Sequence, residues 1–162
     1  MQDPRCVMIL QNDLAPGKAA NAAAVIALTL GQRHPALVGE ALQDADACCY
    51  PGLIPVGIPV LAATHAEMDR LRARCAELAC DLVLFPEQGQ TTTDYAAFSA
   101  AMRDIPASEW RLLGLALVGE KQQVRKLTSK LKLFSLTEAR KAAEFSHFSC
   151  TSVPLYKQLV QL

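Results

Sequence analysis

The stretch "RCVMILQNDLAPGKAANAAAVIALTLG" (residues 5–31) decides the fold. Residues 5–11 form an apolar run with polar ends, which is typical of a buried central strand. Pro16 suits the first turn of a helix, the alanine-rich segment 19–30 consists largely of strong helix formers, and we expect Gly31 to end that helix. A strand, a short loop and a helix in this order predict the start of a βαβ unit.

Lys18 stands in the first turn of this predicted helix. The helix dipole places partial positive charge at that end, so a cation there is unfavourable unless something negative lies beside it. Helix N-termini also bind anions through their free N–H groups. Two interpretations therefore stay open: Lys18 points into water, or it meets an anion.

Three more apolar segments are predicted strands, at residues 58–64, 81–86 and 111–119. Thr64 and Glu67 have the spacing of a capping box, which predicts the start of a helix directly after the first of these strands. The apolar residues that follow recur at helical spacing, so this helix buries one face. The chain thus alternates strand and helix.

The remaining segments complete the expected order of elements. Residues 94–103 and the basic stretch 121–131 are predicted helices, and a second capping-box pattern predicts another helix near 136–145. Residues 31–57 contain many glycines and prolines and little periodicity, so we expect an irregular excursion with one short strand or hairpin.

This pattern predicts an α/β fold with a single domain. We expect a four-stranded mixed or mostly parallel sheet with helices on both faces. The domain covers residues 1–134, and residues 135–162 form a C-terminal helical extension. A chain of 162 residues is long enough for one such core.

Composition excludes several classes of protein. No apolar run reaches the roughly 18 residues of a membrane span, and the N-terminus lacks the pattern of a secretory signal, so we expect a cytoplasmic protein without membrane contact. The six cysteines form no CxxC motif and only three histidines are present, which excludes a zinc-ligand spacing. We expect reduced, mostly buried thiols, with Cys48 and Cys49 in packing roles, and neither a metal nor a cofactor.

The neutral net charge hides an uneven distribution. Residues 37–120 carry 12 acidic against 5 basic residues, and residues 121–162 carry 8 basic against 2 acidic ones. Nucleic-acid binding would rest on a few phosphate contacts, so we expect it to be weak and steeply salt-dependent. The bases expected to make those contacts are Lys121, Arg125, Lys126 and Lys130.

In α/β sheets the ligand crevice lies beyond the carboxyl ends of the strands. That rule selects two polar loops, residues 12–18 and 87–94, which we expect to follow strands that lie side by side. Ester hydrolysis needs a base for the attacking water and a positive group for the oxyanion. Lys18 suits the second role, and Asp13 or Glu87 suits the first or the orientation of Lys18.

Local structural roles are an alternative explanation for the presence of these polar residues. Asp13 is a common turn former, Thr93 or Asp94 is a natural helix N-cap, and an ion pair between Lys18 and Asp13 would occupy both charges. His34 is interpreted as a loop residue rather than a base. No Ser-His-Asp order and no activated cysteine favours a covalent route.

Three segments together resemble a known family. "CVMILQNDLAPGKAANAAAVIAL" (6–28), "LVLFPEQGQTT" (82–92) and "LLGLALVGEKQQVRKLTSKLKLF" (112–134) resemble, in the same order, the main motifs of the archaeal/eukaryotic-type peptidyl-tRNA hydrolases. The segments at 31–40 and 87–95 are more similar to an uncharacterised bacterial family, the domain of unknown function 2000, placed in the same peptidyl-tRNA hydrolase II-like superfamily. The chain is identified as a member of that family by resemblance.

The resemblance carries over residue by residue. Asp13, Gly17 and Lys18 match the first motif, and Gly89 and Thr91 match the second. Glu87 stands where the enzymes have aspartate, Asn21 where they have glutamine, and Gln90 where a basic residue is common. The implied catalytic residues are Lys18, Asp13, Glu87 and Thr91. The implied ligand-binding residues are Gly17, Asn21, Gly89, Thr92 and Thr93.

Three hypotheses about function stay open. The first is a hydrolase that cleaves an ester or amide of an aminoacyl- or peptidyl-tRNA or of a smaller analogue. The second is a non-catalytic binder of a phosphorylated small molecule, and the third is a dimeric regulatory or interaction protein. The expected partners are an anionic small molecule or a tRNA 3′ end, and a second copy of the chain in a homodimer.

Overall fold

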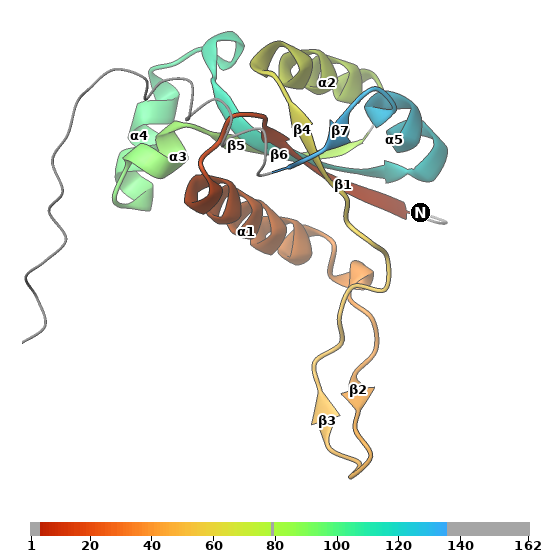
Figure 1. The fold of residues 1–162 in the computed structure, drawn as a ribbon. Helices are drawn as coiled ribbons and strands as arrows, with labels where there is room; N and C mark the ends of the chain where they lie inside the picture. Colours follow the sequence, from red (N-terminus) through yellow and green to blue (C-terminus); the bar gives the residue numbers. More distant parts are fainter. Residues whose placement is uncertain (1–3, 79, 136–162) are drawn as a thin grey trace, which may run out of the picture.

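Five strands form one central sheet, in the order β5-β6-β1-β4-β7 (Figure 1). The computed structural model describes residues 4–78 and 80–135. The strands of the sheet are β1 (Pro4–Gln11), β4 (Val60–Ala63), β5 (Asp81–Pro86), β6 (Leu112–Glu120) and β7 (Lys132–Leu133). All four strands that the sequence predicts are therefore present in one sheet.

The sheet is mixed. β1 and β4 pair in parallel, whereas β6 is antiparallel to both β1 and β5, and β7 is antiparallel to β4. The predicted α/β class with a mixed sheet is confirmed, but the prediction of four strands is wrong, as is that of mostly parallel pairing. The extra strand, β7, pairs only with Leu61 and Ala62, and two residues are too few to produce a periodic pattern.

The strand order also differs from the expectation that β1 and β5 lie side by side, because β6 lies between them. β6 is nine residues long and is buried over most of its length, which is the environment of a central strand. β1, β4 and β5 nevertheless run in the same direction, so their carboxyl ends share one edge of the sheet.

Helices cover both faces of the sheet, as predicted (Figure 1). The helix α1 (Pro16–Arg33) packs on the face to which β1 directs Cys6, Met8 and Leu10. The helices α2 (His65–Glu77) and α5 (Lys121–Thr128) pack on the opposite face, against Val7 and Ile9. The alternation along β1 therefore supplies two apolar layers, one for each set of helices.

The prediction that α1 ends at Gly31 is wrong: the helix continues to Arg33, and His34 is its C-cap. Pro35 follows His34, and a residue before proline avoids the helical conformation. The proline, and not the glycine, therefore sets the end of this helix.

The capping box at the start of α2 is confirmed. Thr64 Oγ1 accepts a hydrogen bond from the Glu67 N–H at 3.3 Å, and Glu67 Oε2 accepts one from the Thr64 N–H at 2.8 Å. These bonds hold the pKa of Glu67 below its usual value. The helix buries Met68, Leu71 and Cys75, as its spacing predicts.

Residues between α1 and β4 form a narrow arm that projects from the body of the protein (Figure 1). It contains a short 3₁₀ helix, η1 (Pro35–Leu37), and an antiparallel hairpin of β2 (Leu42–Gln43) and β3 (Cys49–Tyr50), which confirms the predicted hairpin. Cys49 and its neighbour Cys48 are exposed on it, so the expectation that they pack in the interior is wrong. Residues 40–51 are all exposed, so the hairpin offers these two thiols no interior in which to pack.

The remaining described elements are α3 (Gln88–Thr91), α4 (Tyr95–Arg103) and a second 3₁₀ helix, η2 (Ala107–Glu109). α3 occupies part of the segment expected to be a polar turn, and α5 ends at Thr128 rather than 131. The helix predicted near 136–145 and the predicted extension 135–162 lie almost wholly outside the described residues and stay predictions. No helix within the described ranges is long and apolar enough to cross a membrane.

Asp81 ties the end of α1 to the start of β5. Arg33 donates to both of its carboxylate oxygens, at 2.9 and 2.6 Å, and His34 Nε2 lies 2.6 Å from Oδ2. The hydrogen bonds from Arg33, and secondarily those from His34 and Leu82, lower the pKa of Asp81 to about 2. His34 therefore contacts Asp81 at the amino end of β5, away from the two loops at the carboxyl ends of β1 and β5.

We expect Asp81→Asn to destabilise the protein at neutral pH and to flatten its acid response. A carboxylate whose pKa is lowered on folding stabilises the native state above its unfolded pKa, and this contribution is lost as the pH falls through the folded value. The window runs from about pH 4 down to about pH 2. Melting temperatures of the wild type and the variant should converge across it, whereas Asp69→Asn, an exposed carboxylate on α2, should leave the profile unchanged. A difference that stays constant through this window would contradict the role of the Asp81 carboxylate.

Candidate functional site

The two loops selected by the sequence meet in space. Gln90 in α3 donates a hydrogen bond from Nε2 to the backbone oxygen of Lys18 at 2.9 Å and lies 3.2 Å from Asn21 Oδ1. Both partners belong to the first two turns of α1. The Gln90 side chain thus joins α3 to the start of α1, although β6 separates the strands that precede them.

Lys18 lies in the first turn of α1, and no side chain caps the N-terminus of this helix. The N-cap, Ala15, makes no side-chain cap bond, and the first turn of α1 contains no acidic residue. Pro16 has no N–H, and the first intrahelical bond runs from the Ala19 N–H to the Ala15 oxygen at 2.9 Å. The N–H groups of Gly17 and Lys18 therefore point out of the helix end, where partial positive charge is concentrated.

The ammonium group of Lys18 is exposed, and it forms no ion pair with any carboxylate of residues 4–78 and 80–135. The ion pair with Asp13 that the sequence allows is not present. A Cβ built at Gly17 would meet no atom within 4 Å, so the space in front of this turn is open. Contact of Lys18 with Asp13 or Glu87 through a water or a bound anion stays a prediction.

The two candidate acids have other partners. Asp13 is exposed and accepts a hydrogen bond from Gln11 Nε2. Glu87 pairs with Arg111, whose Nε lies 3.6 Å from Oε2, and the Glu87 N–H donates to the Arg111 oxygen at 2.9 Å. Asp13 is exposed and the Glu87 side chain is 42% exposed, so a water or ligand can reach either carboxylate.

The threonines of the second loop take part in local structure. The hydroxyls of Thr91 and Thr92 both donate to the Gln88 oxygen, at 3.3 and 2.7 Å. Asp94 is the N-cap of α4 and accepts a hydrogen bond from Ala97 N–H at 2.8 Å, so Thr93 is not needed for capping. The oxygens of Thr91 and Thr92 keep lone pairs with which to accept a further hydrogen bond.

Gly89 has a steric reason to be glycine. A Cβ at this position would lie 2.6 Å from Cε2 of the Phe85 ring. The absence of a side chain therefore allows α3 to rest directly on the end of β5, which places Gln90 beside α1.

A cavity of about 460 Å³ lies between α1, β5 and α4. Four of the predicted ligand-binding residues line it, namely Asn21, Gly89, Thr92 and Thr93. The four predicted catalytic residues do not line it. Its apolar wall includes side chains from α1, β5 and α4 to which the sequence analysis assigns no role in a site: Val25, Ile26, Val83, Phe85 and Phe98.

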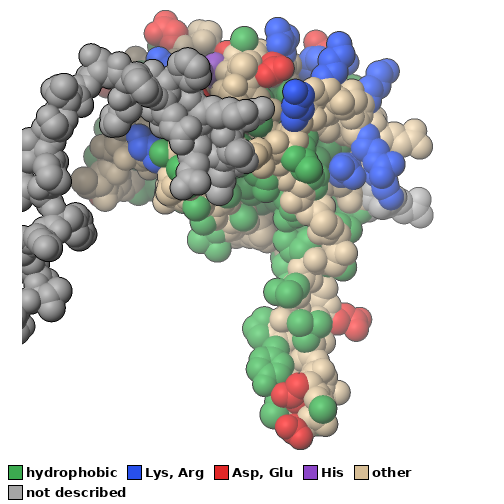
Figure 2. All heavy atoms as spheres, viewed as in Figure 1, with side chains coloured by type: hydrophobic (Ala, Val, Ile, Leu, Met, Phe, Trp, Pro, Cys, Tyr) green, Lys and Arg blue, Asp and Glu red, His purple; other side chains and the backbone are tan. Residues whose placement is uncertain are grey.

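A smaller pocket of about 210 Å³ lies at the carboxyl ends of β1 and β4. Asn12, from the loop that leads to Lys18, lines it together with Lys130 and Lys132. Figure 2 shows lysine and arginine side chains gathered over α2 and α5, with the acidic and apolar surface of the arm at the far end. The basic C-terminal segment therefore adjoins the first candidate loop. Among the described residues, no group of three or more histidine, cysteine, aspartate or glutamate side chains is placed to hold a metal ion.

Comparisons with known proteins agree with this architecture. The family described as "Protein of unknown function (DUF2000)" matches residues 4–135. The solved structure of a protein of unknown function from Agrobacterium tumefaciens str. C58 is similar, with a TM-score of 0.75 and 24% sequence identity over 83% of this chain and 100% of that chain. At this identity the likeness shows the fold alone. No curated protein matches the chain.

Proposed function

The chain belongs to the DUF2000 family of unknown function, and from that premise we propose that it binds the phosphate or another anionic group of a small molecule at the N-terminus of α1. The proposal includes the placement of the family in the peptidyl-tRNA hydrolase II-like superfamily, whose motifs the loops at residues 12–18 and 87–94 resemble. The ligand group would lie in front of Gly17 and Lys18.

One observation carries the proposal: Lys18 stands at an open helix start with no negative partner in the described residues. The dipole, the free N–H groups and the ammonium group would all act on the same anion. In the usual arrangement an acidic residue or a polar N-cap occupies this turn, and neither is present in α1. An incoming anion would compensate the charge that the chain itself leaves uncompensated.

The pocket beside Asn12 supports the same conclusion. Lys130 and Lys132 line it from the chain segment around β7, on the edge of the sheet at which β1 ends. Its one acidic lining residue, Glu67, is engaged in the capping box of α2, so the two lysines outnumber it. They add positive charge near the loop without forming an ion pair with any described carboxylate. An anion approaching this edge would meet cations from two separate segments, which raises its local concentration.

Hydrolysis is a second candidate function, favoured by the contact that joins the two motif loops through Gln90. Asp13 and Glu87 belong to the two loops that this contact joins, and either carboxylate is accessible to a water. The carboxylate would remove a proton from the water, and Lys18 would stabilise the negative charge that develops on the substrate oxygen. The resemblance to peptidyl-tRNA hydrolases suggests an ester of a tRNA or a smaller analogue as the substrate.

We expect Lys18→Ala to abolish most of the thermal stabilisation that phosphate-bearing ligands give the wild type. Loss of a charge-assisted contact weakens binding on the order of 10- to 100-fold. Arg74→Ala, which removes an exposed cation from α2, is the matched control and should respond like the wild type. Equal stabilisation of all three proteins would contradict the anion site.

Two further variants, Asp13→Ala and Glu87→Ala, separate binding from catalysis. Cleavage of peptidyl-tRNA by the wild type that is lost in Asp13→Ala or Glu87→Ala would support the hydrolase. If phosphate-bearing ligands stabilise the wild type but it does not cleave peptidyl-tRNA, the result would support binding alone and exclude peptidyl-tRNA as a substrate. Cleavage by both carboxylate variants at the rate of the wild type would contradict the assignment of either group as the base.

A further inference from the structure

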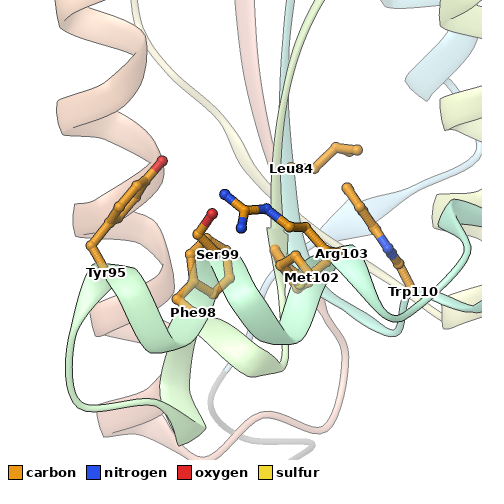
Figure 3. Close-up of a pocket in the computed structure, with 8 residues that line it drawn as sticks. Leu84, Tyr95, Phe98, Ser99, Met102, Arg103 and Trp110 are labelled. Atoms are coloured by element: carbon orange, nitrogen blue, oxygen red, sulfur yellow. The ribbon is translucent and has the colours of Figure 1, made fainter.

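Beyond the site at Lys18, we propose that a second cavity, beside α4, binds a small planar apolar molecule through a carboxylate held by Arg103 (Figure 3). The cavity has a volume of about 350 Å³. It is separate from Lys18, and nothing in the proposed function assigns it a ligand.

Aromatic side chains give this cavity its shape. The rings of Tyr95 and Phe98 pack at a centroid distance of 5.9 Å and an angle of 57°, and this pair also borders the 460 Å³ cavity next to α1. Trp110 forms another wall, and its Nε1–H donates to the Ile105 oxygen at 3.0 Å. That bond fixes the indole ring, so a flat apolar surface is present before any ligand arrives.

Arg103 is the cation in the lining of this cavity. Its side chain extends along α4 toward Ser99 rather than away from the pocket (Figure 3). Within the described residues the guanidinium group forms no ion pair, and neither it nor the Ser99 hydroxyl has a hydrogen-bond partner. The position of Arg103 in the last turn of α4 is favourable for a cation, but the helix dipole does not explain why the side chain lies over an aromatic cavity.

The chemistry of the lining selects the class of ligand. A guanidinium group binds a carboxylate through two parallel hydrogen bonds and stacks on aromatic rings, and Ser99 adds one hydroxyl donor. The volume lies at the lower end of the range for small-molecule sites, and a cavity of roughly 150 Å³ already holds benzene. The cavity therefore fits one or two fused rings, with the carboxylate at the rim beside Arg103.

The test uses Trp110, the single tryptophan of the chain. Its indole N–H gives one signal in a ¹H–¹⁵N spectrum, so a shift of that signal reports on this cavity. We expect 2-naphthoate to shift it saturably in the wild type. The neutral 2-naphthamide and the variant Arg103→Gln should each show binding weaker on the order of tenfold or more. Arg125→Gln, an exposed arginine on α5, and Lys18→Ala should bind 2-naphthoate like the wild type.

Three results would overturn the proposal: no saturable shift in the wild type, equal affinity for naphthoate and naphthamide, or unchanged affinity in Arg103→Gln. A second variant, Ser99→Leu, places a larger side chain in the cavity and should also block the shift. Dispersed amide signals in each variant would show that the fold is intact. Unchanged naphthoate binding in Lys18→Ala would show that this cavity is independent of the anion site. The two proposals can therefore be refuted separately.

Discussion

Ile26→Ala is expected to lower the free energy of unfolding by about 2–5 kcal/mol. Ile26 lies on α1, is 1% exposed, and packs in the layer between that helix and the sheet. Truncation removes buried apolar contacts and leaves a cavity that the surrounding strands cannot fill. Because Ile26 also lines the 460 Å³ cavity, the change additionally enlarges the candidate site.

Urea denaturation followed by circular dichroism measures this loss. Leu28→Ala is the matched control, since Leu28 lies on the same helix but is 80% exposed. That substitution should change the stability by no more than about 0.5 kcal/mol. If both variants lost the same amount, the packing of α1 on the sheet would not be as described.

Gly114→Ala is expected to cost about 1–3 kcal/mol, because it overpacks the contact between β6 and α1. A Cβ at Gly114 would lie 2.8 Å from Leu10 Cδ2, 3.0 Å from Ile26 Cδ1 and 3.1 Å from the backbone oxygen of Ile9. The backbone oxygen cannot move away without distorting β1. Close approach of the helix to the sheet therefore requires glycine here.

A double-mutant cycle tests that geometry. Ile26→Val removes Cδ1, so the loss of stability in Gly114→Ala/Ile26→Val should be smaller than the two separate losses added together. Gly31→Ala is the contrasting control, because a Cβ there meets nothing within 4 Å in the last turns of α1. It should be neutral or stabilise by up to about 1 kcal/mol. Strict additivity in the cycle would contradict the contact between positions 114 and 26.

Local signals predict the elements of this fold well. The apolar run at 5–11, the capping box of Thr64 and Glu67, and the N-cap role proposed for Thr93 or Asp94 each depend on a few adjacent residues, and the structure contains the strand, the box and a cap at Asp94. Such signals are strong because the hydrogen bonds and the burial involved lie within one element.

Non-local pairing explains what the sequence does not predict. The insertion of β6 between β1 and β5 depends on which strands bury both faces, and the two-residue strand β7 exists only because β4 offers it an edge. No local pattern in the sequence carries these two features. The end of α1 is different, because the local signal, Pro35, is present in the sequence only four residues beyond Gly31.

The candidate site likewise contains some features that the sequence predicts and others that it does not. The polar residues after β1 and β5 are visible in the sequence because they interrupt apolar segments. The contact from Gln90 to Lys18 and Asn21, and the apolar walls beside α4, are not visible, since they arise between elements far apart in the chain. The direction of Arg103 into a cavity has no signature in the sequence at all.

The most direct test of the anion site is a titration of the wild-type protein with inorganic phosphate, followed by ¹H–¹⁵N spectra of the backbone amides. We predict saturable shifts of the amide signals of Gly17, Lys18 and Ala19, which lie in the first turn of α1. These shifts should be absent in Lys18→Ala. Shifts confined to the basic surface of α5, or shifts at the start of α1 that persist unchanged in Lys18→Ala, would contradict an anion site built around Lys18.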